Sequence, residues 1–262
     1  MRSRELLAKA GVRLPKVIAV DWDGTLSTLR QGGPRVLRAF LAEAFREAGL
    51  DPESHPEAIR HFVHGAAGST AHTQARKMSQ LLESLGGRPF SCVERAGDAL
   101  SRGYEQRCLA RLKWRPRRWL LPGALGLLRD CRRHGIAVHL VTGSPQVSVE
   151  EEIRRLRLLP YFTAVHGASP GDGPDFKRLR FESIAARHGI PLCQLGVVGD
   201  GPGEMRAGQA LGCPLVGIAI EESRHHACEV KARILRDLGV VLITDRLCRV
   251  LPLLSQQMKQ EP

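Results

Sequence analysis

The chain has 262 residues, of which 43% are hydrophobic and 25% charged, a composition typical of a globular protein that buries a substantial apolar core. No stretch approaches the roughly 18 uninterrupted apolar residues of a membrane-spanning helix. Residues 1–16 carry several charges and lack the apolar run of a signal peptide. These features argue against a membrane protein or an exported one, and we expect no membrane partner.

The formal net charge is +12, and arginine supplies most of it, with a local cluster over residues 111–118. Such a charge attracts anions, either a phosphoester or a nucleic acid. No nucleic-acid-binding motif accompanies the charge, so we interpret it as a solvated basic surface. A nucleic-acid partner is not expected, although the charge alone does not exclude one.

The seven cysteines are scattered over residues 92–248 and form no Cys-x-x-Cys pair. Cysteines of exported proteins usually occur in even numbers and pair as disulfides, whereas an odd and scattered set favours reduced thiols. We therefore expect a cytoplasmic protein.

The first element along the chain is a strand, because residues 17–20 form an apolar run that ends at Asp21. Such a run suits a strand buried on both faces of a parallel sheet. From residue 33 to residue 118, apolar residues recur at helical spacing between Gly and Pro residues, without a strand pattern. This pattern predicts an inserted helical domain with helices over residues 36–48, 55–63, 70–85 and 92–112.

After residue 118 the pattern alternates between helices and strands. It predicts helices over residues 124–134, 146–158, 176–188, 203–211 and 228–238. Strands are predicted over residues 136–141, 161–166, 195–198, 214–220 and 240–244, and a polar tail over 256–262. Alternation of this kind favours a parallel sheet with right-handed crossovers. We predict an α/β fold: a Rossmann-like core of residues 1–32 and 119–262, with a helical insert of residues 33–118.

Polar, glycine-associated clusters follow three of the predicted strands. Asp21 follows the first, residues 142–144 (Thr-Gly-Ser) follow the second, and residues 199–201 (Gly-Asp-Gly) follow a later one. Ligands of parallel α/β sheets bind at the carboxyl ends of the strands. The sequence therefore predicts that the three clusters meet at one edge of the sheet.

Asp21 and Asp23 lie where the first strand ends, and Gly24 with Thr25 forces a turn directly afterwards. Two carboxylates two residues apart can divide the work of a nucleophile or metal ligand and a general acid/base. The alternative is a loop with an incidental acidic pair. A carboxylate that ends an apolar strand must be solvated or bound, which favours the functional interpretation.

Thr142, Gly143 and Ser144 precede a predicted helix, where hydroxyls and free N–H groups suit a phosphate. The alternative is ordinary capping by Ser144, with Pro145 as the first helical residue. Both can hold at once, because a cap and a phosphate site use neighbouring donors.

Lys177 begins a predicted helix, and its point charge suits a phosphoryl oxygen; an exposed lysine at a helix start is the alternative. Asp200 and Glu204 follow another apolar strand within Gly-Asp-Gly-Pro-Gly-Glu. Their oxygens suit a hard cation such as Mg²⁺. The alternative is a surface turn with Glu204 in the first turn of a helix, where the dipole favours it.

In this order and spacing, the four segments resemble the haloacid dehalogenase superfamily of aspartate-nucleophile phosphotransferases. DWDGT (21–25) is similar to its first motif, LVTGS (140–144) to its second, Lys177 to its third, and GDGPGE (199–204) to an Asp-x-x-x-Glu form of its fourth. The helical insert resembles the cap of the phosphoglycolate phosphatase-like and β-phosphoglucomutase-like branch.

The resemblance implies a role for each matching residue. Asp21 would be the nucleophile that becomes an aspartyl-phosphate, and Asp23 would protonate the leaving oxygen and then activate water. Thr142 and the Gly143 amide would hold the transferring phosphoryl group. Lys177 would offset the negative charge around the nucleophile and the phosphate.

The resemblance also implies a magnesium site. Asp200 would hold Mg²⁺, with the Asp21 carboxylate and the Asp23 backbone carbonyl as further ligands, and Glu204 would orient the metal shell. True dehalogenases of the superfamily lack the second aspartate of the first motif and need no Mg²⁺. The presence of Asp23, Asp200 and Glu204 therefore favours phosphotransfer.

Caps in this branch contribute a substrate-facing loop, so the insert supplies candidates for substrate specificity. These candidates are Gly65, Ser69, Thr70 and Gln74, together with Arg30 at the hinge after the first motif. The alternative is a plain interhelical turn in which Ser69 or Thr70 caps a helix.

The expected function is Mg²⁺-dependent hydrolysis of a small phosphomonoester, such as a sugar phosphate or a phosphoglycolate-like acid. A phosphomutase, which returns the phosphoryl group to its substrate, is one alternative. A non-catalytic nucleic-acid-binding protein on the same fold is another, suggested by the net charge. The complete set of motif residues argues against it, whereas steeply salt-dependent nucleic-acid binding that survives Asp21→Asn would support it.

Overall fold

The computed structural model describes residues 14–30, 33–65, 70–113, 116–169, 171–173, 175–221 and 226–258. The chain divides into two compact units, one of Met1–Leu29 with Arg115–Pro262, and one of Arg30–Trp114. The predicted boundaries, after residues 32 and 118, lie three and four residues beyond those of the structure, which fall after residues 29 and 114.

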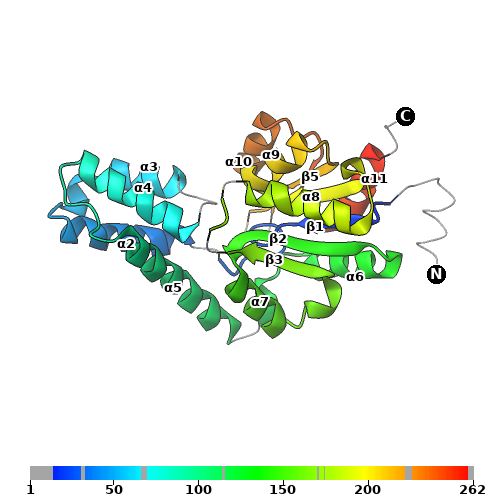
Figure 1. Ribbon diagram of the computed structural model, residues 1–262, viewed down its shortest axis with the longest axis horizontal. Coiled ribbons are helices and arrows are strands. Elements are labelled where there is room, and N and C mark those ends of the chain that lie inside the picture. The colour runs from blue at the N-terminus through cyan, green and yellow to red at the C-terminus, as the bar shows by residue number, and fades with distance from the viewer. Residues whose placement is uncertain are drawn as a thin grey trace. The chain divides into compact units, whose positions relative to one another are not determined.

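The larger unit is built on a six-stranded sheet in the order β3-β2-β1-β4-β5-β6 (Figure 1). Each strand is parallel to its neighbours. The strands are β1 (Val17–Val20), β2 (Ala137–Pro145), β3 (Ala164–Ala168), β4 (Leu195–Gly199), β5 (Leu215–Ile218) and β6 (Ile243–Thr244). The predicted Rossmann-like α/β core is confirmed.

Helices cover both faces of the sheet, with α8 and α9 on one side and α6 and α7 on the other in Figure 1. The helices are α6 (Ala124–His134), α7 (Gln146–Arg155), α8 (Phe176–His188), α9 (Pro202–Ala210), α10 (Glu229–Asp237) and α11 (Val250–Gln257). Apolar residues of α8, α9 and α10 share one core cluster with β1, β4 and β5. Among the described residues, no helix has the length and apolar character needed to cross a bilayer.

Strand β1 lies at the centre of the sheet, between β2 and β4. All four of its residues are at most 1% exposed, as expected for an apolar run buried on both faces. From β1 the sheet grows by β2 and β3 on one side and by β4, β5 and β6 on the other. The strand order therefore reverses at β1, which is where such sheets bind ligands.

Most predicted elements of this unit are present, with shifted ends. Strand β2 continues to Pro145 instead of ending at residue 141, because residues beyond the bulge still pair with β3. Strand β3 begins only at residue 164, since residues 159–161 form a 3-10 turn. Helix α11 was not predicted and includes the first two residues of the expected polar tail.

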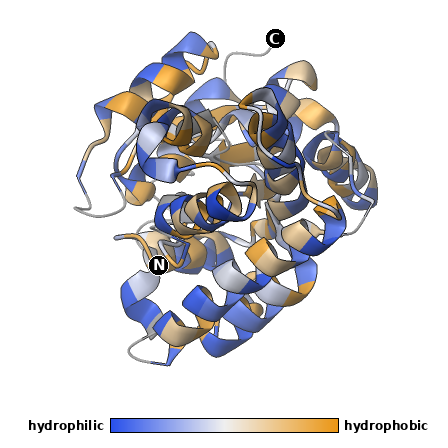
Figure 2. Ribbon diagram, turned by 90° about the vertical axis from the view of Figure 1, so that its left-hand side faces the viewer, coloured by the Kyte–Doolittle hydropathy of each residue, from blue (hydrophilic) through white to orange (hydrophobic). Residues whose placement is uncertain are grey.

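The smaller unit is helical, with α2 (Gly33–Glu47), α3 (Pro56–Gly65), α4 (Ala71–Ser84) and α5 (Val93–Leu112). The four predicted helices agree with these within three residues at each end. Apolar side chains of all four helices form one core cluster that includes Leu41, Phe45, Met78 and Leu100. Hydrophilic and hydrophobic residues share each helix (Figure 2), as amphipathic packing requires.

A chain of three histidines lies in the larger unit. His139 on β2 is fully buried. Its Nδ1 lies 3.1 Å from Nε2 of His166 on β3, and its Nε2 lies 2.8 Å from Nε2 of His188 on α8. Burial, and after it the charges of His166, His188 and Arg187, lower the pKa of His139 to about 4. The ring is therefore neutral in the native protein near pH 7.

We expect the buried His139 to make the native protein less stable in acid. An unfolded histidine has a pKa of about 6.5, so between about pH 6.5 and pH 4 the unfolded state binds more protons than native His139. The native state should thus lose up to about 3 kcal/mol of stability as the pH falls through this window. Urea unfolding at pH 7 and pH 4.5 measures the loss, and His139→Leu should lose less. An equal pH dependence in the variant would contradict the prediction.

Candidate active site

The carboxyl ends of β1 and β4 lie at the same level of the sheet. Val20 is opposite Val198 in register, and the Asp21 N–H donates to the Val198 carbonyl at 2.9 Å. Asp21 therefore leaves β1 while still bonded to β4, and it is only 7% exposed. Asp200 directly follows β4, so two carboxylates meet at this edge, where the sequence predicted them.

A tight turn follows Asp21. The Ser27 N–H donates to the Trp22 carbonyl at 2.9 Å. Gly24, inside the turn, has a φ of +77°, and a Cβ there would lie 2.1 Å from Oδ2 of Asp200. Glycine is required because it adopts positive φ without strain and leaves room for the carboxylate.

Lys177, in the first turn of α8, contacts two carboxylates. Its Nζ donates to Asp21 Oδ1 at 2.9 Å and to Glu204 Oε2 at 2.6 Å. Burial alone would lower the pKa of Lys177, but the charges of the two carboxylates and the hydrogen bonds to them outweigh burial and raise the pKa. Lys177 is therefore a constant positive charge beside Asp21.

Glu204 lies in the first turn of α9 and is buried. Its Oε1 accepts the Gly201 N–H at 2.5 Å, which satisfies a donor at the start of the helix in the manner of a capping box. A Cβ at Gly199 would lie 2.2 Å from Cγ of Glu204. Glu204 thus lies in the first turn of a helix, as the alternative interpretation of the sequence expected. Its other carboxylate oxygen, Oε2, contacts Lys177.

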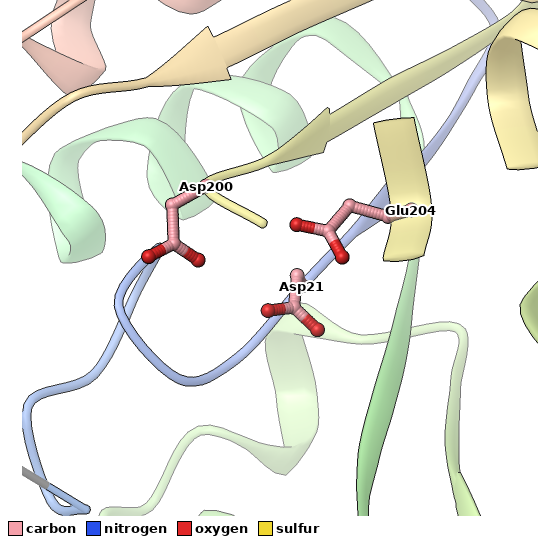
Figure 3. Close-up of side chains that lie close together, drawn as sticks. All are labelled: Asp21, Asp200 and Glu204. Atoms are coloured by element: carbon pink, nitrogen blue, oxygen red, sulfur yellow. The ribbon is translucent and has the colours of Figure 1, made fainter. Parts of the chain in front are cut away.

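The side chains of Asp21, Asp200 and Glu204 lie close together (Figure 3). One oxygen from each carboxylate lies within 4.8 Å of the other two. Burial raises the pKa of Asp21; Lys177 opposes this, and the charges of Glu204 and Asp200 raise it further. A divalent cation would offset this crowding of negative charge, and an all-oxygen donor set suits Mg²⁺. The residues present therefore fit a magnesium ion.

A hydrogen bond from a residue of β2 orients the Asp23 side chain. The Ser144 hydroxyl donates to Asp23 Oδ2 at 2.6 Å. The alternative in which Ser144 caps the next helix, with Pro145 as its first residue, is wrong, because Pro145 is the N-cap of α7 and helix α7 starts at Gln146. Strand β2 runs on through Ser144, and this extension brings the hydroxyl to Asp23 at the sheet edge.

Thr142 and Gly143 lie on the same stretch of β2. Thr142 is 2% exposed, and its hydroxyl accepts the Ser144 N–H at 3.2 Å. Gly143 is exposed, and a Cβ there would meet no atom within 4 Å. This end of β2 therefore has open space beside its backbone.

Two further side chains of the site were missed by the sequence analysis. Lys231, near the start of α10, donates to Asp200 Oδ2 at 2.6 Å. The Thr25 hydroxyl donates to Asp200 Oδ1 at 3.1 Å. Thr25 stands in the first motif and could have been proposed from it, whereas no local pattern distinguishes Lys231 from a surface lysine.

Trp22, between the two aspartates of the first motif, is fully buried. Its Nε1 donates to Oε2 of Glu152 at 2.7 Å, and Glu152 on α7 is 2% exposed. This bond connects the turn after β1 to helix α7.

We expect Glu152→Leu to leave the Trp22 N–H buried without its acceptor and to lower the free energy of unfolding by about 1–3 kcal/mol. Glu152→Gln keeps an acceptor and should cost less. Urea unfolding measures both variants, with the exposed Glu150→Leu of the same helix as the control. Equal losses in the Gln and Leu variants would show that the hydrogen bond contributes nothing.

The specificity candidates lie in the smaller unit. Thr70 is the N-cap of α4 and accepts the Thr73 N–H at 3.2 Å, which agrees with the capping interpretation. Gln74 is 6% exposed, and its Oε1 accepts a hydrogen bond from Tyr104 at 2.9 Å. Gly65 is the last residue of α3. Ser69 lies outside the described residues, and Arg30 is the first residue of this unit.

The structure is thus a parallel α/β sheet with a buried carboxylate at its strand-order reversal, and a lysine and two more carboxylates surround that carboxylate. The chain belongs to the haloacid dehalogenase-like hydrolase family, whose model matches residues 15–212. The resemblance predicted from the four motifs is thereby confirmed.

Individual relatives come from the predicted branch. A phosphoglycolate phosphatase of Salmonella paratyphi A is 31% identical over 103 residues, which are 38% of this chain and 40% of that protein. The match thus spans less than half of this curated relative.

Solved structures show the same fold. The β-phosphoglucomutase of Clostridium difficile superposes with a TM-score of 0.66 at 14% identity and covers 94% of this chain and 98% of its own. CbbY of Rhodobacter sphaeroides, in complex with xylulose-(1,5)bisphosphate, gives a TM-score of 0.58 at 17% identity and covers 89% and 95%. At these identities the likeness concerns the fold.

Proposed function

We propose that this protein is a Mg²⁺-dependent phosphatase that hydrolyses a small phosphomonoester through an aspartyl-phosphate on Asp21. The observation that carries the proposal is the position of Asp21, buried at the end of the central strand and 2.9 Å from the ammonium of Lys177. Membership of the hydrolase family and the match to a phosphoglycolate phosphatase support it.

In the first step, a carboxylate oxygen of Asp21 attacks the phosphorus atom, and the bond from phosphorus to the substrate oxygen breaks. The Thr142 hydroxyl and the Gly143 N–H hold phosphoryl oxygens, and Lys177 offsets their charge. Asp21 and Asp200 would hold Mg²⁺, with the Asp23 carbonyl as a further ligand and Glu204 orienting the shell. When bound, the ion neutralises charge on the transferring group.

Asp23 acts on both sides of the intermediate. Its carboxylic acid gives a proton to the leaving oxygen, and the resulting carboxylate takes a proton from the water that attacks phosphorus. Inorganic phosphate leaves and Asp21 is regenerated. The hydrogen bond from Ser144 at 2.6 Å supports this role, since it orients the Asp23 carboxyl group.

We also propose that residues 30–114 act as a cap that selects the substrate and excludes bulk water. Gly65, Ser69, Thr70 and Gln74 are the proposed specificity residues, with Arg30 at the hinge. The expected partner is a small phosphorylated metabolite, and the expected location is the cytoplasm.

The test is phosphate release from a panel of phosphorylated metabolites, including phosphoglycolate and sugar phosphates, with Mg²⁺ and with excess chelator. The Asp21→Asn variant serves as the control. We expect release from at least one monophosphate that depends on both Mg²⁺ and Asp21. Equal release by the wild type and the variant would overturn the proposal.

A phosphomutase is the second candidate, favoured by the fold shared with the β-phosphoglucomutase of Clostridium difficile. The same nucleophile would serve, but the phosphoryl group would return to the sugar. Phosphorus NMR of a sugar phosphate incubated with the enzyme distinguishes the two, because a mutase accumulates an isomeric sugar phosphate and a phosphatase accumulates inorganic phosphate.

A further inference from the structure

Lys231 forms a shielded ion pair with the carboxylate that follows β4. Its Nζ lies 2.6 Å from Asp200 Oδ2, and the two side chains are 20% and 13% exposed. Lys231 lies near the start of α10, so the contact joins two separate elements. Partial burial keeps water from screening such a pair fully.

Among the described residues, two ammonium groups contact the three carboxylates of the acidic cluster, Asp21, Asp200 and Glu204. Lys177 contacts Asp21 and Glu204, and Lys231 contacts Asp200. Each carboxylate of the acidic cluster is thus already paired with a lysine. With all three carboxylates ionised, these five groups carry one net negative charge, which a cation would offset.

Both oxygens of Asp200 have protein partners, because Oδ1 accepts from Thr25 at 3.1 Å and Oδ2 accepts from Lys231 at 2.6 Å. A cation that binds Asp200 must share an oxygen with one of these donors or displace it. The Thr25 hydroxyl is neutral, whereas the Lys231 ammonium repels a cation placed a few ångströms away. Lys231 is therefore the partner that opposes metal binding.

We propose that Lys231 is a positioning residue that holds Asp200 in place and competes with the divalent cation for it, so that Lys231 sets the Mg²⁺ affinity of the site. The inference rests on the proposed function, since it takes the acidic cluster as the magnesium site. It predicts that removing this one charge strengthens metal binding while the rest of the site is unchanged.

The experiment is calorimetric titration of the full chain with MgCl₂, without substrate. We expect Lys231→Met to bind Mg²⁺ about tenfold more tightly than the wild type. Lys231→Arg keeps the charge and should stay near the wild-type affinity. Arg233→Met removes an exposed charge from the same helix and should leave the affinity unchanged.

Thermal unfolding confirms that each variant is folded, and Lys231→Gln, which keeps a donor for Asp200, replaces the Met variant if that one does not fold. Unchanged or weaker Mg²⁺ binding in the neutral variants, with normal binding by the wild type, would overturn this inference alone. Absence of Mg²⁺ binding in the wild type and in every Lys231 variant would overturn the proposed magnesium site as well. If Arg233→Met bound Mg²⁺ as much more tightly as Lys231→Met, the effect would come from the net charge of the protein and not from the contact with Asp200. That result would also overturn the inference.

Discussion

Asp21→Asn is expected to lower the rate of phosphate release by about 10⁴-fold or more while leaving the protein folded. An amide oxygen is a far weaker nucleophile than a carboxylate, so the variant could not form the proposed aspartyl-phosphate. The fold should persist, because asparagine has nearly the same shape and removes one of three crowded negative charges. Lys177 keeps its second partner, Glu204.

The measurement is kcat with the best substrate from the metabolite panel, together with the melting temperature of each protein. Asp237→Asn, an exposed aspartate at the end of α10, is the matched control and should behave as the wild type. An active Asp21→Asn variant would show that another group attacks. A variant that fails to fold would contradict the expected stability.

Lys177→Met is expected to give the largest loss of stability among the site variants. The side chain is 17% exposed and bonds to two buried carboxylates. Removing the ammonium leaves Asp21 and Glu204 without their shared counter-ion. Breaking a buried ion pair from one side costs about 3 kcal/mol or more.

Magnesium should recover part of this loss, because a cation bound by the native acidic cluster stabilises that state over the unfolded chain. Urea unfolding with and without Mg²⁺ measures both effects. Arg178→Met, at the next residue along α8, removes a cation from surface pairs with Asp175 and Glu182 and should cost at most about 1 kcal/mol. Equal losses in the two variants would contradict the prediction.

The central features of the fold could be predicted because they depend on short stretches of sequence. The run at residues 17–20 is apolar throughout, as a strand buried on both faces requires, and helix α8 has the predicted bounds. The prediction is less accurate where pairing with a neighbouring strand decides where a strand ends. Strand β2 extends to Pro145 because it pairs with β3, and no residue between 142 and 145 signals this.

The sequence by itself determined the chemical groups and the strand ends that carry them. Asp21 and Asp200 each follow an apolar strand, and parallel strands bring their carboxyl ends to one edge. Only the tertiary structure decided which side chains meet there. Ser144 reaches Asp23, Glu152 reaches Trp22, and Lys231 reaches Asp200. These contacts join residues far apart in the chain. Their geometry depends on how the strands pair and how the helices pack on the sheet, which local patterns do not encode.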